Sequence, residues 1–248
     1  MIYLLFALFG LLVALLLNVL ADDLPARARV RRPHCTQCGH GFAPAGWLAL
    51  GRLMFQGGHC PQCGRATARR AVALEIGLPF LFALLPLVFT RPGDLIFGAL
   101  YTAILILIII TDLEHRLILH IVTFPSTLLA LLGSFFVSHT NLKLALIGAV
   151  VGFVAFYLFF LLGQFLFGPG ALGFGDVTLS MTMGAMLGFP YIVFALVIGI
   201  LLGGVVSLLL VFTRRRARRS YIPYGPYLAL GGLLMLWWGA EIFRWYIT

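Results

Sequence analysis

The chain has 248 residues, of which 62% are hydrophobic and only 10% are charged. This balance excludes an ordinary water-soluble domain, and the missing two-residue alternation argues against a membrane β-barrel. A net charge of +9 would suggest nucleic acid in a soluble protein, but arginine kept on the cytoplasmic side of a membrane explains it, so we expect no nucleic-acid partner.

Eight apolar windows predict membrane helices, because a segment in lipid must satisfy its own backbone hydrogen bonds. They are residues 2–21, 72–90, 95–111, 118–137, 142–162, 177–188, 191–212 and 228–247. The sixth is too short to cross unless it tilts or packs beside a thinned or water-filled site. Prolines predict kinks in the second and fourth windows. The expected fold is an all-α polytopic membrane protein with about eight transmembrane helices.

Three regions follow from this pattern. Residues 1–21 form the first transmembrane helix, which lacks the basic start of a cleaved signal peptide. Residues 22–71 form a cytoplasmic loop, and residues 72–248 form the membrane core. With the N-terminus outside, fourteen of the 17 Lys and Arg residues lie inside, including the cluster 214–219.

All four cysteines of the chain lie in the loop of residues 22–71. The spacing is Cys-x2-Cys-x21-Cys-x2-Cys with a glycine after each pair, formed by Cys35, Cys38, Cys60 and Cys63. Four thiolates at such a spacing fill the tetrahedral shell of structural zinc and leave no open position for catalysis. We therefore expect a zinc-binding loop domain.

Other interpretations of the cysteines stay open. Disulfides fit the spacing, although the topology places the loop in the reducing cytoplasm. A thioredoxin-like redox pair lacks the surrounding strand and helix pattern. His34, His40 and His59 are possible substitute ligands, which we expect to be bystanders. Glu75 opens the second window beside this loop, where an acid suits the helix dipole and a supporting role is open.

Two aspartates are the candidate catalytic residues. Asp112 closes the apolar run 95–111, Asp176 follows Gly173-Phe-Gly175, and the topology puts both at the cytoplasmic rim. Asp112 could be a juxtamembrane charge in water, and Asp176 could be a helix N-cap. Against this, the dipole disfavours an anion at a helix C-terminus, and Gly173 and Gly175 give the backbone freedom to bring Asp176 close to another group.

Our hypothesis is that the two acids form one proteolytic dyad. An ionised carboxylate takes a proton from water while its protonated partner polarises the scissile carbonyl. Glu114 and His115, near Asp112, are expected to be solvated rim residues.

Together these residues resemble the prepilin peptidases, also called type 4 prepilin leader peptidases, a branch of the GxGD membrane aspartyl proteases. The resemblance extends over nearly the whole chain. It includes the four-cysteine spacing, Glu75, Asp112-Leu113, Gly173-Phe-Gly-Asp176 and Ile222-Pro-Tyr-Gly-Pro-Tyr227. It implies an aspartic endopeptidase of the bacterial inner membrane, with its active site facing the cytoplasm, where it contacts membrane lipid and removes the basic leader of type IV prepilin or pseudopilin precursors. The pathways implied are type IV pilus assembly and type II secretion.

Many members of this family also methylate the new N-terminus with S-adenosylmethionine. The sequence shows no glycine-rich nucleotide fingerprint and gives no position for that cofactor. Three departures from the family pattern stand out: Thr178 replaces the usual lysine after GxGD, Leu119-His120 replaces Pro-Asp after the first aspartate, and Asp22-Asp23 replaces a basic region.

Two non-catalytic alternatives are a transporter that uses the acids as a proton or cation site, and an assembly scaffold for pili or secretion organised by zinc. Inverted repeats and acids at the membrane midplane would favour the transporter, and the sequence shows neither. It leaves the oligomeric state and the identity of the pilin substrate open.

Overall fold

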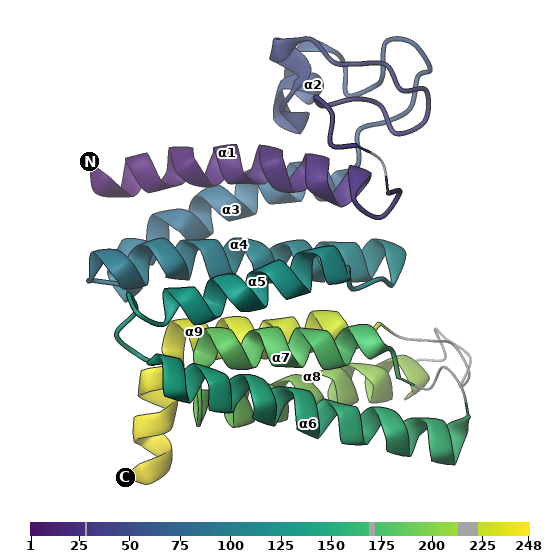
Figure 1. Cartoon of the computed structure of the whole chain (residues 1–248). Helices are drawn as coiled ribbons and strands as arrows, with labels where there is room; N and C mark the ends of the chain where they lie inside the picture. Colours follow the sequence, from purple (N-terminus) through teal and green to yellow (C-terminus); the bar gives the residue numbers. More distant parts are fainter. Residues whose placement is uncertain (28, 169–171, 213–222) are drawn as a thin grey trace. The chain divides into compact units, whose positions relative to one another are not determined.

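The protein is helical throughout the part of the chain that the structure describes. The structure is a computed structural model, and it describes residues 1–27, 29–168, 172–212 and 223–248. The helices are α1 (Ile2–Asp23), α2 (Ala49–Phe55), α3 (Arg69–Val88), α4 (Pro92–His115), α5 (His120–Gly133), α6 (Leu142–Phe167), α7 (Phe174–Leu187), α8 (Tyr191–Phe212) and α9 (Gly225–Ile247), with a 3-10 turn at Pro44–Gly46 (Figure 1). The all-α prediction is confirmed over these residues, and every predicted window contains a helix.

Six of the described helices, α1, α3, α4, α6, α8 and α9, are long and apolar enough to cross a membrane. α5 and α7 have 14 residues each and are about 21 Å long, less than the roughly 30 Å of a bilayer's hydrocarbon core. The predicted window 118–137 is longer than its helix, which ends at Gly133. α5 and α7 are therefore shorter than the hydrocarbon core is thick.

The backbone stays helical at all three prolines of the predicted kinks. Pro79 and Pro86 lie inside α3, and Pro125 lies inside α5. In α9, by contrast, Trp238 has a non-helical backbone (φ −124°, ψ 15°), and the helix bends there (Figure 1). The arginine cluster 214–219 lies outside the described residues, as does Ile222, the first residue of the motif at residues 222–227.

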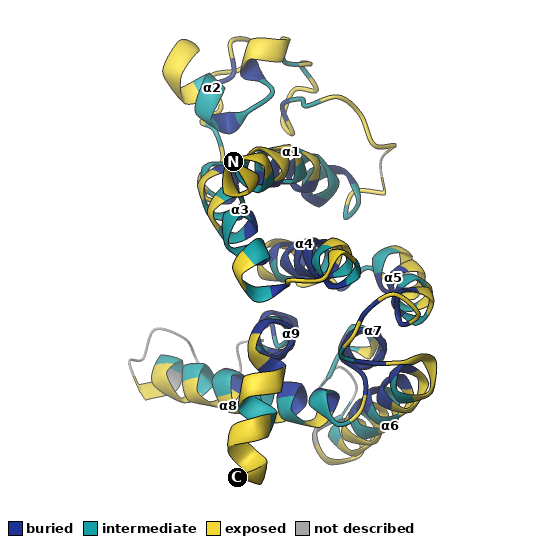
Figure 2. Cartoon of the chain, turned by 90° about the vertical axis from the view of Figure 1, so that its left-hand side faces the viewer, coloured by how far each residue is buried: buried dark blue, intermediate teal, exposed yellow. Residues whose placement is uncertain are grey.

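The chain packs as two compact units, Met1–Thr90 and Arg91–Thr248. In the first, α1 packs along α3, and α2 packs against α3 as well. In the second, α7 contacts α5, α6, α8 and α9, while α4 packs against α9 and α5. Every residue of α7 from Asp176 to Leu187 except Met181 is buried (Figure 2). A helix enclosed in this way does not need the length of a lipid-facing span.

Small residues bring the backbones of α6 and α7 into contact. A Cβ atom at Gly148 would collide with the carbonyl oxygen of Gly184, and one at Gly152 would collide with that of Ser180. Small residues four positions apart on both helices permit this close crossing, as they do in other membrane helix pairs. The crossing fixes α7, and with it Asp176, against the longer helix α6.

Candidate active site and metal centre

Asp112 lies in the last turn of α4 and is buried, with 5% of its surface exposed. The C-cap of α4 is Arg116, which has a left-handed backbone (φ 54°, ψ 41°) and whose N–H donates to the carbonyl of Asp112 at 2.9 Å. The Asp112 carboxylate accepts a hydrogen bond from the backbone N–H of Gly225, the first residue of α9. The interpretation of Asp112 as a charge in water is therefore wrong, because protein surrounds it.

Gly225 gives Asp112 the space to approach the start of α9. A Cβ atom at position 225 would lie 2.6 Å from Oδ2 of Asp112 and 2.9 Å from Cδ1 of Ile118. Both distances are below van der Waals contact, so a side chain at this position would displace the carboxylate or Ile118. The requirement for glycine here is one of space.

Asp176 is the third residue of α7 and is 3% exposed. The N-cap of α7 is Gly173, so the interpretation of Asp176 as an N-cap is wrong. The Asp176 carboxylate accepts from the N–H of Gly173, and the Asp176 N–H donates to the Gly173 carbonyl at 3.1 Å. The first of these bonds is the N3 half of a capping box and the second joins the two backbones, and together they fix the acid at the helix start.

The two glycines before Asp176 act differently from the prediction. Gly173 has an extended backbone (φ −80°, ψ 140°) that any residue adopts, so conformational freedom does not explain it. At Gly175, a Cβ atom would lie 2.7 Å from Cβ of Ile118. Gly175 therefore lets the start of α7 pack directly on Ile118, the same residue that lies against Gly225.

These contacts bring the two acids to one site. Asp112 and Asp176 interact electrostatically, and Asp176 also interacts with Tyr224, the N-cap of α9. The C-terminal end of α4 and the N-terminal ends of α7 and α9 thus meet around Ile118. A buried pair of carboxylates can activate water between them.

Some residues near the two acids are exposed, and others contact the helix that carries Asp176. Glu114 and His115 are exposed, with 3.9 Å between the His115 Nε2 and a Glu114 carboxylate oxygen, which agrees with a solvated rim. Thr178 and His120, two departures from the family pattern, contact each other, with 3.3 Å between Oγ1 and Nδ1. Sequence reasoning treated them separately and missed Ile118 and the role of Gly225, because these contacts join residues far apart in the chain.

The four cysteines form two matching turns. In each, the glycine after the second cysteine has a left-handed backbone, with φ of 72° at Gly39 and 73° at Gly64. The Gly39 N–H donates to the Cys35 carbonyl at 2.8 Å, and the Gly64 N–H donates to the Cys60 carbonyl at 2.9 Å. The two turns share the sequence His-Cys-x-Gln-Cys-Gly, at residues 34–39 and 59–64, whose cysteine pairs and glycines the sequence analysis identified.

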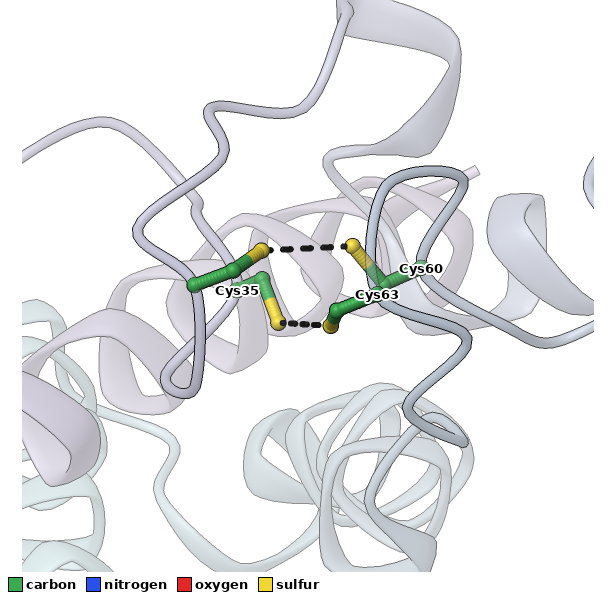
Figure 3. A group of neighbouring side chains, drawn as sticks. Cys35, Cys60 and Cys63 are labelled. Atoms are coloured by element: carbon green, nitrogen blue, oxygen red, sulfur yellow. Dashed lines mark hydrogen bonds between the residues drawn. The ribbon is translucent and has the colours of Figure 1, made fainter.

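The sulfur atoms of the two turns face each other (Figure 3). The Cys35 and Cys63 sulfurs are 3.6 Å apart, the Cys38 and Cys60 sulfurs are 3.7 Å apart, and all four lie within 4.8 Å of one another. Sulfurs at about 2.3 Å from a tetrahedral zinc ion would be separated by about 3.8 Å. The thiols are free, and the donor set fits zinc.

The nearby histidines make other contacts. His34 Nε2 lies 3.5 Å from a carboxylate oxygen of Asp23, and His59 Nδ1 lies 2.7 Å from the Gly57 carbonyl. His40 packs edge-on against Phe42, with 6.2 Å between ring centroids. Among the described residues, the ligand group consists of the four cysteines without a histidine.

Glu75 joins the loop to the helices of the first unit. It is 2% exposed, and its two carboxylate oxygens accept from the N–H groups of Ala49 at 2.7 Å and Leu50 at 2.8 Å, at the start of α2. Asn18 Nδ2 of α1 adds a third contact at 3.4 Å. One buried acid thus connects α1, α2 and α3.

The acids that replace the expected basic region make a second connection. Asp22 pairs with Arg70 at 2.7 Å, and Asp23 accepts from the backbone N–H of Arg31 at 2.9 Å. Asp22 ties the end of α1 to the start of α3, and Asp23 ties it to the chain that leads into the cysteine turns.

Comparisons with known proteins cover both units. Residues 99–208 match the type IV leader peptidase family, and residues 8–89 match the bacterial peptidase A24 N-terminal domain. A prepilin leader peptidase/N-methyltransferase of Aeromonas salmonicida strain A449 is 27% identical over 227 residues, which are 92% of this chain and 78% of that protein. A protein of the same description from Pseudomonas aeruginosa is 28% identical over 213 residues, 86% of this chain and 73% of its own. One from Xanthomonas campestris pv. campestris is 35% identical over 136 residues, 55% of this chain and 47% of its own. No solved structure matches the chain.

Proposed function

The chain belongs to the type IV leader peptidase family, and on that premise we propose that it is an aspartic endopeptidase with Asp112 and Asp176 as its catalytic pair. Its substrates would be type IV prepilins or pseudopilins, cleaved between the basic leader and the apolar helix at the cytoplasmic face of the bacterial inner membrane. The observation that supports this proposal is that two buried carboxylates, at the C-terminal end of α4 and the N-terminal end of α7, interact electrostatically.

The chemistry needs one ionised and one protonated carboxyl. The ionised acid removes a proton from water, which attacks the carbonyl carbon of the scissile bond while the protonated acid donates to the carbonyl oxygen. The tetrahedral intermediate then collapses: the peptide nitrogen takes a proton from the acid that gained one, the C–N bond breaks, and a hydroxyl of the intermediate returns a proton to the acid that gave one. Gly225 N–H and Gly173 N–H each bind one of the two carboxylates and hold its position.

We place this pair at the cytoplasmic rim because of the charge distribution. Fourteen of the 17 basic residues fall in the loops on the side where α4 ends and α7 begins, if the N-terminus is outside. A prepilin leader is basic, and its apolar helix enters the membrane beside the enzyme. The partners are therefore the precursor helix and membrane lipid.

We also propose that the four cysteines bind a structural zinc ion. Cys35, Cys38, Cys60 and Cys63 would hold it as thiolates, and four protein ligands leave no position for substrate. Zinc would join the two turns and so give the loop its fold.

We propose N-methylation with S-adenosylmethionine as a second activity, because the relatives are described as N-methyltransferases as well as leader peptidases. Buried polar atoms without a hydrogen-bond partner in the described part of the first unit include Asn18 Oδ1, Arg52 Nε and Gln56 Oε1. A polar cofactor is a group that could satisfy such atoms. Mass spectrometry of a processed pilin tests this activity, since an unmodified N-terminal amine would refute it.

The test of proteolysis uses the full chain in membranes with a prepilin precursor as substrate. Asp112→Asn and Asp176→Asn should each abolish cleavage while the protein remains at the parental level. Glu114→Gln is the matched control, because Glu114 is an exposed acid two residues from Asp112 at the same helix end. This control variant should cleave the precursor at the parental rate. Full processing by either Asp→Asn variant would reject the catalytic pair and leave the transporter and scaffold alternatives.

A further inference from the structure

We propose that His120 is a positioning residue for Asp176, acting through the hydroxyl group of Thr178. The proposal rests on the proposed function, because it assigns a role in placing one of the two proposed catalytic acids. It concerns a chain of hydrogen bonds that joins α5 to the backbone immediately before Asp176.

The direction of each hydrogen bond follows from the atoms. Thr178 Oγ1 lies 3.0 Å from the Gly175 carbonyl oxygen, which only accepts, so the hydroxyl must donate its single proton there. Thr178 Oγ1 also lies 3.3 Å from His120 Nδ1. Because the hydroxyl proton is already used, His120 must donate from Nδ1–H. The order is therefore imidazole to hydroxyl to carbonyl.

This chain ends on the peptide that carries Asp176. The Gly175 carbonyl belongs to the peptide bond whose nitrogen is that of Asp176, so a force on the carbonyl acts directly on the backbone of the acid. Thr178 is 1% exposed, which excludes water as a ready substitute for the hydroxyl donor. His120 is exposed, so its ring can be replaced without opening a cavity in the core.

Aromatic contacts hold the imidazole ring in the required orientation. Its centroid is 5.7 Å from that of Phe124 on α5 and 5.9 Å from that of Phe174, with interplanar angles of 36° and 63°. Phe174 is the first residue of α7, and Thr178 lies one turn later. His120 thus contacts α7 at Phe174, before Asp176 in the chain, and at Thr178, after it.

Further along α5 and α7, the two helices are joined by hydrogen bonds between threonines, none of which titrates. Thr127 Oγ1 and Thr182 Oγ1 are 2.8 Å apart, and Thr182 Oγ1 lies 3.1 Å from the Thr123 carbonyl. This second connection keeps the two helices together when the His120 contact is removed. Loss of His120 should therefore shift the start of α7 without separating the helices.

The experiment compares side chains that keep or lose the donor at the Nδ1 position. An asparagine amide nitrogen can take the place of Nδ1, whereas a glutamine amide reaches the place of Nε2. His120→Asn should keep nearly parental kcat for prepilin cleavage, and His120→Gln should lower kcat by about tenfold or more with little change in KM, because small misplacements of a reacting group carry large rate costs. Equal kcat for the two variants would overturn the proposal.

A second pair of variants tests the hydroxyl group. Thr178→Val keeps the shape of the side chain and removes the hydroxyl donor, so its kcat should fall as far as that of His120→Gln. Thr178→Ser keeps the hydroxyl donor, so its kcat should stay close to the parental value. Combining His120→Gln with Thr178→Val should cost no more than either change alone, since both break one chain of hydrogen bonds. Additive losses, or parental kcat in Thr178→Val, would refute the linkage.

The outcome is distinguishable from failure of the proposed function. If Asp176→Asn abolishes cleavage and the His120 and Thr178 variants cleave at the parental rate, the positioning role alone is wrong. If Asp176→Asn cleaves normally, the catalytic assignment itself is wrong. Unfolding temperatures of the purified full-length variants in detergent, measured alongside, should stay close to the parental value, and a fall in kcat that tracks a fall in unfolding temperature would overturn the proposal.

Discussion

Replacing Glu75 by glutamine should loosen the attachment of α2 to the helices of the first unit. The two carboxylate oxygens of Glu75 accept from the N–H groups of Ala49 at 2.7 Å and Leu50 at 2.8 Å. Glutamine keeps one acceptor oxygen and replaces the other with an NH2 group. One of the two backbone N–H groups would then face a donor instead of an acceptor.

The expected cost follows from that single lost bond. A hydrogen bond to a charged group contributes about 1.5–3 kcal/mol, and the site is too buried for water to replace it, since Glu75 is 2% exposed. A change of about 1.4 kcal/mol is tenfold in an equilibrium constant, so local opening of α2 should increase about ten- to a hundredfold. Glu75→Ala removes both acceptors and should increase opening further.

Hydrogen exchange of the α2 amides, measured by mass spectrometry on the full-length protein in detergent at constant zinc concentration, reads this opening directly. Glu114→Gln serves as the control, because it removes an exposed acid in the other unit. Unchanged exchange of residues 49–55 in Glu75→Gln would refute the assignment of Glu75 as the anchor of α2.

Three other changes have expected outcomes. Gly225→Ala should reduce prepilin cleavage by about a hundredfold, because its Cβ would lie 2.6 Å from Oδ2 of Asp112 and displace it, and parental kcat in a cleavage assay would contradict this contact. Cys35→Ser combined with Cys60→Ser should remove bound zinc and raise the protease sensitivity of residues 22–71, as should treatment of the parent with a strong chelator; stoichiometric zinc in the double variant, measured by elemental analysis, would reject the four-thiolate site. Gly184→Val should lower the unfolding temperature markedly, because its side chain would collide with the backbone of α6, and an unchanged temperature would show that α6 and α7 do not cross this closely.

The membrane helices could be predicted from the sequence because lipid imposes one simple requirement on them. A long apolar run must be helical, so each predicted window contains a helix, and the ends differ by a few residues. The window 177–188 differs from the others in being too short to span the bilayer. It is short because α7 is enclosed by other helices, and its buried Ser180 and Thr182 are the sequence signal of an interior helix.

The candidate site could be predicted only in part. The two acids stood out because the chain has only eight Asp and Glu residues and because the topology put these two on one side. Their neighbours were not predictable, because Ile118 and Gly225 acquire their role from contacts between distant segments. Gly175 was identified for the wrong reason: its backbone is ordinary, and it is the contact with Ile118 that excludes a side chain.

In the cysteine loop, too, the local pattern could be predicted from the sequence and the long-range contacts could not. The spacing of the ligands is a local property and predicted the cluster that the structure forms. The anchoring role of Glu75 and the pairing of Asp22 with Arg70 depend on how α1 and α3 pack, which no local pattern records.

The position of Glu75 in the chain sets an order for biosynthesis. A ribosome releases all four cysteines before it releases Glu75, since translation runs from residue 35 through 63 and only then to 75. If the cysteines bind zinc as proposed, the thiols can capture the ion while α3 is still being made, and the acid that receives α2 emerges afterwards. A chain made without zinc would then complete α3 while its two cysteine turns are still unjoined, and α2 would have to reach Glu75 from an unordered loop.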